Sequence, residues 1–155
     1  MKFTFSWLCE HLDTDKTLDE ICEALPMLGL EVEKLHDPLS VLAPFLIVEI
    51  IEASPHPDAD RLRVCRVNTG EDELQIVCGA PNARAGLRTV LASVGTYVPG
   101  PDLVIKQGKI RGQISQGMLC SLSELKLGEE HDGITELPSD AVVGSGFADF
   151  AQSEY

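Results

Sequence analysis

This sequence has few aromatic and few cationic residues. Aromatic side chains make up 5% of the 155 residues, and 12 Lys and Arg stand against 25 Asp and Glu, a formal net charge of -13. Such a charge argues against unaided electrostatic binding to nucleic acid. The three regions 1–38, 39–148 and 149–155 are each acidic, by -6, -5 and -2. Any RNA contact must therefore come from a local cationic cluster.

The sequence also lacks the short motifs of common enzymes. It contains neither a G-x-x-x-x-G-K-[ST] nor a G-x-G-x-x-G phosphate loop, and no G-x-S-x-G nucleophile elbow. Runs of acidic residues such as Glu71-Asp72-Glu73 and Glu129-Glu130 lie in turn-like segments and suit a solvated surface. We therefore expect no catalytic residue in this chain.

Long apolar runs and an even cysteine set are missing as well. The longest apolar stretch, 41–48, contains Pro44 and falls far below the roughly 20 residues that span a bilayer. The apolar run 3–8 is too short and too closely followed by acidic residues for a signal peptide. Five widely spaced cysteines suit reduced thiols better than a disulfide framework. A cytoplasmic protein without membrane contact is expected.

Residues 1–38 are expected to form a small, incomplete α/β piece. Thr17 and Glu20 make a T-x-x-E capping box, which predicts the start of an amphipathic helix. Pro26 and Gly29 should kink or end that helix. A turn of helix capped by Ser6 is also expected, and short strands are expected at 2–5 and 30–35.

Residues 39–148 read as a β domain with short turns. Strands are expected at 45–53, 61–67, 74–78 and 88–92, with a last pair within 103–114 and a bulge in the second strand. The predicted fold class is α+β, mainly β, with a five-stranded barrel. The strand pattern alone suits an OB-fold, a sandwich or another small barrel.

The stretch 109–121 is the best candidate for a ligand surface. Lys109, Arg111 and Gln113 alternate with less polar residues, so an extended strand would place them on one face. An edge strand with solvated charges explains the same pattern. The pattern leaves both interpretations open.

The segment His56-Pro57-Asp58-Ala59-Asp60 offers three possible metal ligands within five residues. A turn is favoured over a metal site, because prolines fix the backbone and Asp58 and Asp60 can accept backbone N–H bonds. Pairing of Asp60 with Arg61 or Arg63 is expected. No metal site is predicted.

An RNA-binding groove needs cations for phosphates, polar groups for sugars or base edges, and aromatic platforms. Tyr97 alone is a plausible platform in the barrel, so contact should favour the RNA backbone and shape over base identity. Structural roles remain open for some candidates, Met118 in the core and Ser115 and Gln116 in a turn. The candidate RNA-binding residues are Lys106, Lys109, Arg111, Ser115, Gln116 and Met118, with Asn82 on a possible second side.

Several motifs together resemble a known family. The segments HPDADRL (56–62), VCGAPN (77–82), KIRG (109–112) and SQGMLCS (115–121) resemble the tRNA-binding OB-fold module. The segments MKF (1–3), SWL (6–8) and MLGLEVE (27–33) resemble the N-terminus of the bacterial phenylalanyl-tRNA synthetase beta subunit. The resemblances cover nearly the whole chain.

The resemblance implies a fold and a parent enzyme. Residues 39–148 would be a tRNA-binding OB-fold domain, and 149–155 the start of the chain returning to the N-terminal domain. The parent would be an alpha2-beta2 heterotetramer that uses ATP and magnesium to charge the phenylalanine tRNA. Adenylation would belong to the alpha subunit, so this chain would bind tRNA or brace the assembly and carry no cofactor.

Three other functions remain open. The barrel could be a protein-interaction scaffold without RNA contact, which the net charge of -13 favours. It could belong to a free-standing tRNA-binding cofactor protein. A small-ligand or oligosaccharide-binding OB domain is the weakest alternative, because no aromatic cluster lines the expected face. Neither DNA nor a membrane is an expected partner.

Overall fold

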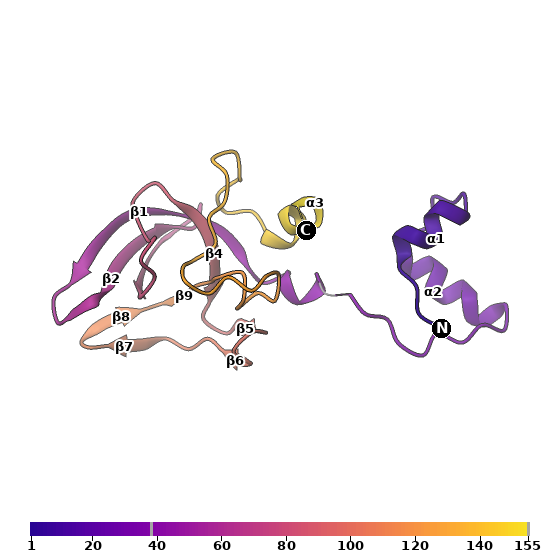
Figure 1. Cartoon of the computed structure of the whole chain (residues 1–155), viewed down its shortest axis with the longest axis horizontal. Helices are drawn as coiled ribbons and strands as arrows, with labels where there is room; N and C mark the ends of the chain where they lie inside the picture. Colours follow the sequence, from indigo (N-terminus) through magenta and orange to yellow (C-terminus); the bar gives the residue numbers. More distant parts are fainter. Residues whose placement is uncertain (38, 155) are drawn as a thin grey trace. The chain divides into compact units, whose positions relative to one another are not determined.

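The computed structural model describes residues 1–37 and 39–154. The chain divides into two compact units, Met1–His36 and Asp37–Tyr155 (Figure 1). Each unit is described by itself below.

The N-terminal unit contains two helices, α1 (Phe5–His11) and α2 (Leu18–Met27). Thr17 and Glu20 form the predicted capping box at the start of α2, with each side chain accepting the other residue's backbone N–H. The helix ends just after Pro26, which lies in its last turn. The predicted exit between Pro26 and Gly29 is confirmed.

The prediction of strands at 2–5 and 30–35 is wrong, because no strand occurs among residues 1–37. Phe5 instead begins α1, and Thr4 rather than Ser6 caps that helix by accepting a hydrogen bond from Trp7 N. A strand needs a partner for its backbone groups, and neither segment has one within this unit. The N-terminal unit is helical where α/β structure was expected.

The second unit is built on a five-stranded antiparallel sheet in the order β3-β2-β1-β4-β9. Gln116 N donates to Gln75 O (2.9 Å) and brings the two outer strands together, so the sheet nearly closes into a barrel. This confirms the predicted mainly β, five-stranded, OB-like architecture. The strands are β1 (Leu46–His56), β2 (Ala59–Asn68), β3 (Glu73–Cys78), β4 (Arg88–Ser93) and β9 (Gly117–Leu119).

The fifth barrel strand is β9, which lies later in the sequence than the predicted last strand pair within 103–114. The segment 103–114, expected as the last main strand pair, belongs to two small hairpins between β4 and β9. The first pairs β5 (Tyr97–Val98) with β6 (Leu103–Val104), and the second pairs β7 (Gly108–Ile110) with β8 (Gln113–Ser115). The connection between the fourth and fifth barrel strands therefore carries structure of its own.

The bulge lies in β1 rather than in β2. The register shifts between Ile50 and Glu52, whose partners Val67 and Arg66 are neighbours, so Ile51 is the extra residue. Strand β2 pairs with β3 without interruption over 63–68. The irregular apolar spacing in β2 reflects the partial exposure of its first half.

The first half of β1, residues 46–50, is buried on both faces. Val48 and Ile50 point into the barrel with Val67 and Ile76, whereas Ile47 points the other way into a second cluster. The helices η1 (Ser40–Leu42) and α3 (Phe147–Glu154) cover that second cluster and contribute Leu42 and Phe147. Two core clusters thus pack against β1, one inside the barrel and one beneath η1 and α3.

The barrel cysteines act as small apolar side chains, as predicted. Cys65, Cys78 and Cys120 are buried and form no disulfide. Burial raises the pKa of the Cys65 thiol to about 11, and it also raises the pKa of Cys78 and Cys120. Thiols of this kind are poor nucleophiles.

Across residues 1–37 and 39–154, no helix has the length and hydropathy needed to cross a bilayer.

Candidate nucleic-acid interface

The tips of two hairpins meet at one end of the barrel. His56 Nε2, at the end of β1, lies 3.0 Å from Ile110 O in the β7–β8 hairpin. Arg111 Nη1 donates to Asp58 O (3.1 Å) beside it. Figure 1 shows the β7–β8 hairpin running alongside the β1–β2 hairpin. In OB-folds the loops after the first and fourth barrel strands flank the oligonucleotide-binding face, and these are the two connections joined here.

His56 is the buried centre of this junction, with 5% of its surface exposed. Asp58 N donates to His56 Nδ1 (3.0 Å), so Nδ1 is an acceptor and the ring hydrogen lies on Nε2, which donates to Ile110 O. Both nitrogens are therefore used in hydrogen bonds. The described residues contain no group of three potential metal ligands, and the turn was the favoured interpretation of this segment.

Two details of that turn differ from expectation. The acceptor of the backbone N–H is His56 rather than an aspartate, because the imidazole lies beneath the turn. Within 1–37 and 39–154, Asp60 forms no ion pair with Arg61 or Arg63. Arg63 instead donates to Ala83 O (2.7 Å) and ties β2 to the loop after β3.

The β7–β8 hairpin carries the local cations that the sequence required. Lys106, Lys109 and Arg111 are all exposed, and residues 103–123 contain these three cations and no Asp or Glu. Arg111 and Gly112 have φ of 49° and 88° and form a two-residue turn between paired Ile110 and Gln113. Positive φ at both positions is typical of a type I′ hairpin turn. We call Lys106, Lys109 and Arg111 the cationic rim.

The single extended strand expected for 109–114 is wrong, because the Arg111-Gly112 turn reverses the chain. Lys109 therefore pairs with Ile114 across the hairpin, and the strand that contains Lys109 ends before Gln113. Arg111 stands at the tip, where its guanidinium contacts Asp58 O.

Ser115 and Gln116 hold this hairpin to the barrel. The Ser115 hydroxyl is buried, accepts from Val77 N (3.1 Å) and donates to Gly117 O (3.0 Å). Gln116 Oε1 accepts from Gln75 N (3.1 Å). Met118 is half-buried against the core cluster that contains Val90 and Phe147. These positions match the alternative in which the three side chains have structural roles.

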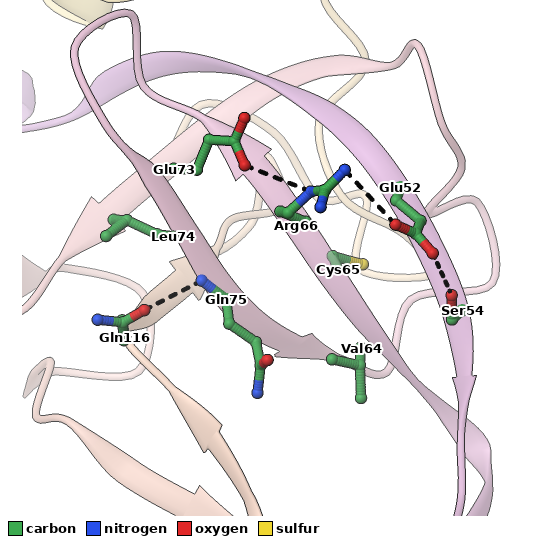
Figure 2. A pocket seen from close by; sticks show the side chains of 9 residues that line it. All are labelled: Glu52, Ser54, Val64, Cys65, Arg66, Glu73, Leu74, Gln75 and Gln116. Carbon is green, nitrogen blue, oxygen red and sulfur yellow. Dashed lines mark hydrogen bonds and ion pairs between the residues drawn. The ribbon is translucent and has the colours of Figure 1, made fainter.

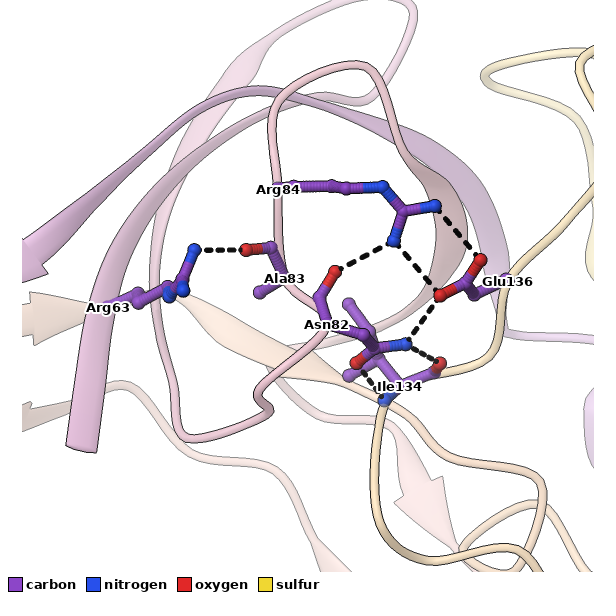
Figure 3. A network of polar contacts seen from close by, with 6 residues as sticks. All are labelled: Arg63, Asn82, Ala83, Arg84, Ile134 and Glu136. Carbon is purple, nitrogen blue, oxygen red and sulfur yellow. Dashed lines mark hydrogen bonds and ion pairs between the residues drawn. The ribbon is translucent and has the colours of Figure 1, made fainter.

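Asn82 lies in the loop after β3 and contacts a different segment (Figure 3). Its amide accepts from Ile134 N (3.0 Å) and donates to Ile134 O (2.8 Å) and to Glu136 Oε1 (3.0 Å). Arg84 completes the network with two 3.0 Å bonds to the Glu136 carboxylate. The structure therefore joins Asn82 to 134–136 and not to the cationic rim.

A shallow hollow of about 420 Å³ lies on the outer surface of β1, β2 and β3. Figure 2 shows Arg66 between Glu52 (3.6 Å) and Glu73 (3.4 Å), so one cation faces two carboxylates. Gln75 and Gln116 form the side of the hollow nearest the β7–β8 hairpin. This surface is not electropositive, so it does not add to the phosphate attraction of the cationic rim.

Sequence reasoning missed the roles of His56, Arg66 and Gln75 in this region. The pairing of Arg66 with Gln75 follows from the β2–β3 register, which the short Gly70-Glu71-Asp72 turn could have indicated. The contact from His56 to Ile110 spans 54 residues. Nothing in the local sequence signals it.

Comparisons with known proteins agree with this architecture. Residues 45–146 match the family described as "Putative tRNA binding domain". The phenylalanine–tRNA ligase beta subunit of Rhodospirillum rubrum is 59% identical over 144 residues, covering 93% of this chain and 18% of its own length. The same subunit of Gluconobacter oxydans is 55% identical, covering 98% and 19%. The chain thus spans about a fifth of these relatives.

One solved structure supports the fold alone. The MetRS-related protein of Pyrococcus horikoshii superimposes with a TM-score of 0.52 at 22% identity, over 73% of this chain and 97% of its own. The likeness to the ligase subunits extends over nearly the whole chain, as the sequence motifs indicated.

Proposed function

This chain belongs to the tRNA-binding domain family, and from that premise we propose that its barrel binds tRNA through the cationic rim. The observation that carries the proposal is the junction of the two hairpin tips, where His56 and Arg111 fix the β7–β8 hairpin beside the β1–β2 turn. Three exposed cations without a neighbouring carboxylate in the sequence can contact phosphates even on an acidic molecule.

Within this proposal the other candidate residues support the rim. Ser115 and Gln116 fix the base of the hairpin on β3, and Met118 packs beneath it. Asn82 supports the loop after β3. Their contribution to tRNA binding would come mainly from positioning, whereas Lys106, Lys109 and Arg111 would touch the RNA.

The proposed setting is the beta subunit of a phenylalanine–tRNA ligase, the name that the related proteins carry. There the chain would act as an auxiliary tRNA contact in the cytoplasm, beside an alpha subunit in an alpha2-beta2 enzyme. ATP and magnesium would serve the charging reaction elsewhere in the parent. The proposed domain bounds are 1–38, 39–148 and 149–155. The last segment would be the start of the chain that returns to the first domain.

The proposal is tested by titrating fluorescently labelled phenylalanine tRNA with the 155-residue chain and following anisotropy. Wild type should bind saturably at low salt, and Arg111→Glu should weaken binding at least several-fold. Lys34→Glu, in the N-terminal unit, changes the net charge equally and should bind like wild type. Absence of binding even at low salt, or equal loss in both variants, would refute a site on the rim.

A protein-interaction scaffold is the second candidate, and the net charge of -13 favours it. Arg111→Glu separates the two functions in the assembled ligase. If tRNA retention falls while subunit assembly is intact, the rim binds RNA. If fewer subunits assemble while the assembled fraction binds tRNA as wild type does, the barrel is a scaffold.

A further inference from the structure

The outer face of the β5–β6 hairpin combines an aromatic ring with a cation. Tyr97 pairs with Val104 across the hairpin. Just after β6, Ile105 is buried whereas Val104 and Lys106 on either side of it are exposed, the alternation expected of an extended chain, so Lys106 shares the exposed side with Val104. Burial agrees with this assignment. Val98 and Ile105, which alternate with these residues, are 0% and 6% exposed, whereas Tyr97 and Val104 are 43% and 50% exposed.

The Tyr97 ring is held in place from its outer end. Its hydroxyl donates to Asp102 Oδ1 (2.6 Å), in the turn between the two strands. This hydrogen bond raises the pKa of the phenol above its ordinary value of 10, so the ring is neutral. An ordered ring loses little conformational freedom when a flat ligand stacks on it.

Tyr97 has few competitors for this role. Among the described residues of the second unit, the other aromatic side chains are Phe45 and Phe147, both 0% exposed, and Phe150, which packs against the core. The hydrogen bonds Gly95 N to Ile105 O (2.8 Å) and Ile105 N to Thr96 O (2.9 Å) extend the pairing as far as the residue before Lys106. The pairing that carries the Tyr97 ring therefore ends one residue before Lys106, the first cation of the rim.

We propose that Tyr97, Val104 and Lys106 form a stacking site for one unpaired nucleotide of the bound RNA. The base stacks on the Tyr97 ring and extends over Val104, while Lys106 contacts a flanking phosphate. This inference rests on the proposed function and adds a single-stranded element to it. Asp102 repels phosphate, so the RNA backbone passes on the Lys106 side of the ring.

This site favours single strands over duplexes and shows little base preference. Every base has a π-face, whereas bases within a duplex are already stacked on one another. The aromatic ring therefore selects for exposed bases, and the rim supplies affinity without sequence recognition.

The test compares Tyr97→Leu, which keeps an apolar side chain without the ring, with Tyr97→Phe, which keeps the ring and loses the hydroxyl. The probe is a labelled 12-nucleotide single-stranded RNA, with the corresponding RNA duplex as reference. Tyr97→Leu should weaken single-strand binding roughly 5- to 150-fold, the range for loss of one stacked base. Tyr97→Phe should stay within about threefold, and duplex binding should change little in either variant.

A second measurement does not depend on the binding affinity of any variant. In wild type, single-stranded RNA should shift the Tyr97 ring proton resonances upfield, with Tyr97→Phe used only to assign them. Unchanged resonances, or wild-type affinity of a folded Tyr97→Leu, would overturn the stacking site. If Arg111→Glu still weakened binding several-fold in that case, the proposed function would survive. If neither substitution affected binding, both proposals would fall.

Discussion

Asn82 illustrates what one amide side chain does in this barrel. It accepts Ile134 N–H and donates to Ile134 O, so it pairs the backbone of a segment that belongs to no strand of the barrel sheet. A Cβ on Gly133 would lie 2.5 Å from Asn82 Oδ1, which shows how closely the two segments approach. The amide takes the place of a missing strand partner.

Asn82→Ala should therefore lower the free energy of unfolding by about 1–3 kcal/mol, because it leaves the Ile134 backbone groups without their partner. Urea unfolding followed by circular dichroism measures the change. Gln152→Ala removes an exposed amide from α3 and is the matched control, with an expected change below about 0.5 kcal/mol. Equal stability of the two variants would contradict the structural role of Asn82.

Glu136 gives this network a pH dependence. Hydrogen bonds from Arg84 and then Asn82 lower the pKa of the carboxyl from 4.5 to about 2. Because the folded-state pKa lies below the unfolded value, this stabilisation is present above pH 4.5 and is lost as the pH falls towards 2. The carboxylate is exposed to solvent, so its contribution is modest.

The measurement compares wild type with Glu136→Gln by urea unfolding between pH 6 and pH 2.5. Wild type should be the more stable above pH 4.5, and the difference should shrink at lower pH. The other carboxylates titrate in both proteins and cancel in the comparison. A difference that stays constant across this range would show that the charge of Glu136 contributes nothing.

At the scale of elements, the β7–β8 hairpin is attached at both ends. Its base is fixed to β3 through Ser115 and Gln116, and its tip is fixed to the β1–β2 turn through His56 and Arg111. Two-stranded hairpins are marginally stable by themselves. These attachments explain how a hairpin with exposed Ile110 and Ile114 keeps one position.

His56→Phe should free the tip of the hairpin, because it keeps a flat ring and removes both hydrogen bonds. Amide hydrogen exchange in 108–115 should become faster, and stability should fall by about 1–3 kcal/mol. The same substitution at exposed His131 should do neither. Unchanged exchange in 108–115 would mean that the base alone holds the hairpin.

How far the sequence predicts these elements depends on how local their causes are. The capping box of α2 and the first four barrel strands follow from residues within a few positions of each other. The Arg111-Gly112 turn lacks the Asn-Gly or Asp-Gly pair that usually marks such a turn, so the strand appeared continuous. The contact between His56 and Ile110 depends on barrel closure, and residue periodicity carries no information about it.

The site residues follow the same rule. Exposure of Lys106, Lys109 and Arg111 could be anticipated, because charged side chains rarely lie in a core. Burial of Ser115 could not, because it depends on Val77 N from a strand 38 residues earlier. These polar residues lie close together in the sequence, which suggested a single surface. The structure divides them between the rim and its support.

At the scale of the whole molecule, an acidic body carries a small cationic rim. The net charge of -13 repels polyanions at a distance, while three cations attract phosphates nearby. The hollow on β1, β2 and β3 does not add to this attraction, because Arg66 faces Glu52 and Glu73. Binding should therefore be weak and limited to a few phosphates.

The dependence of tRNA affinity on salt tests this balance. Each phosphate contact contributes about -0.7 to -0.9 to the slope of log K against log salt, so three contacts predict a slope of about -2 to -3. A fourfold rise in salt should weaken binding roughly 20- to 40-fold.

Arg111→Glu should reduce the magnitude of the slope by about 1, whereas Lys34→Glu should leave it unchanged. A wild-type slope beyond about -5 would require phosphate contacts outside the rim. A slope near zero with binding retained would remove phosphate from the interaction, and the exposed apolar and aromatic side chains of the β5–β6 hairpin would then have to account for the affinity. Because the slope counts contacts independently of their strength, it tests the rim even where the affinity itself is low.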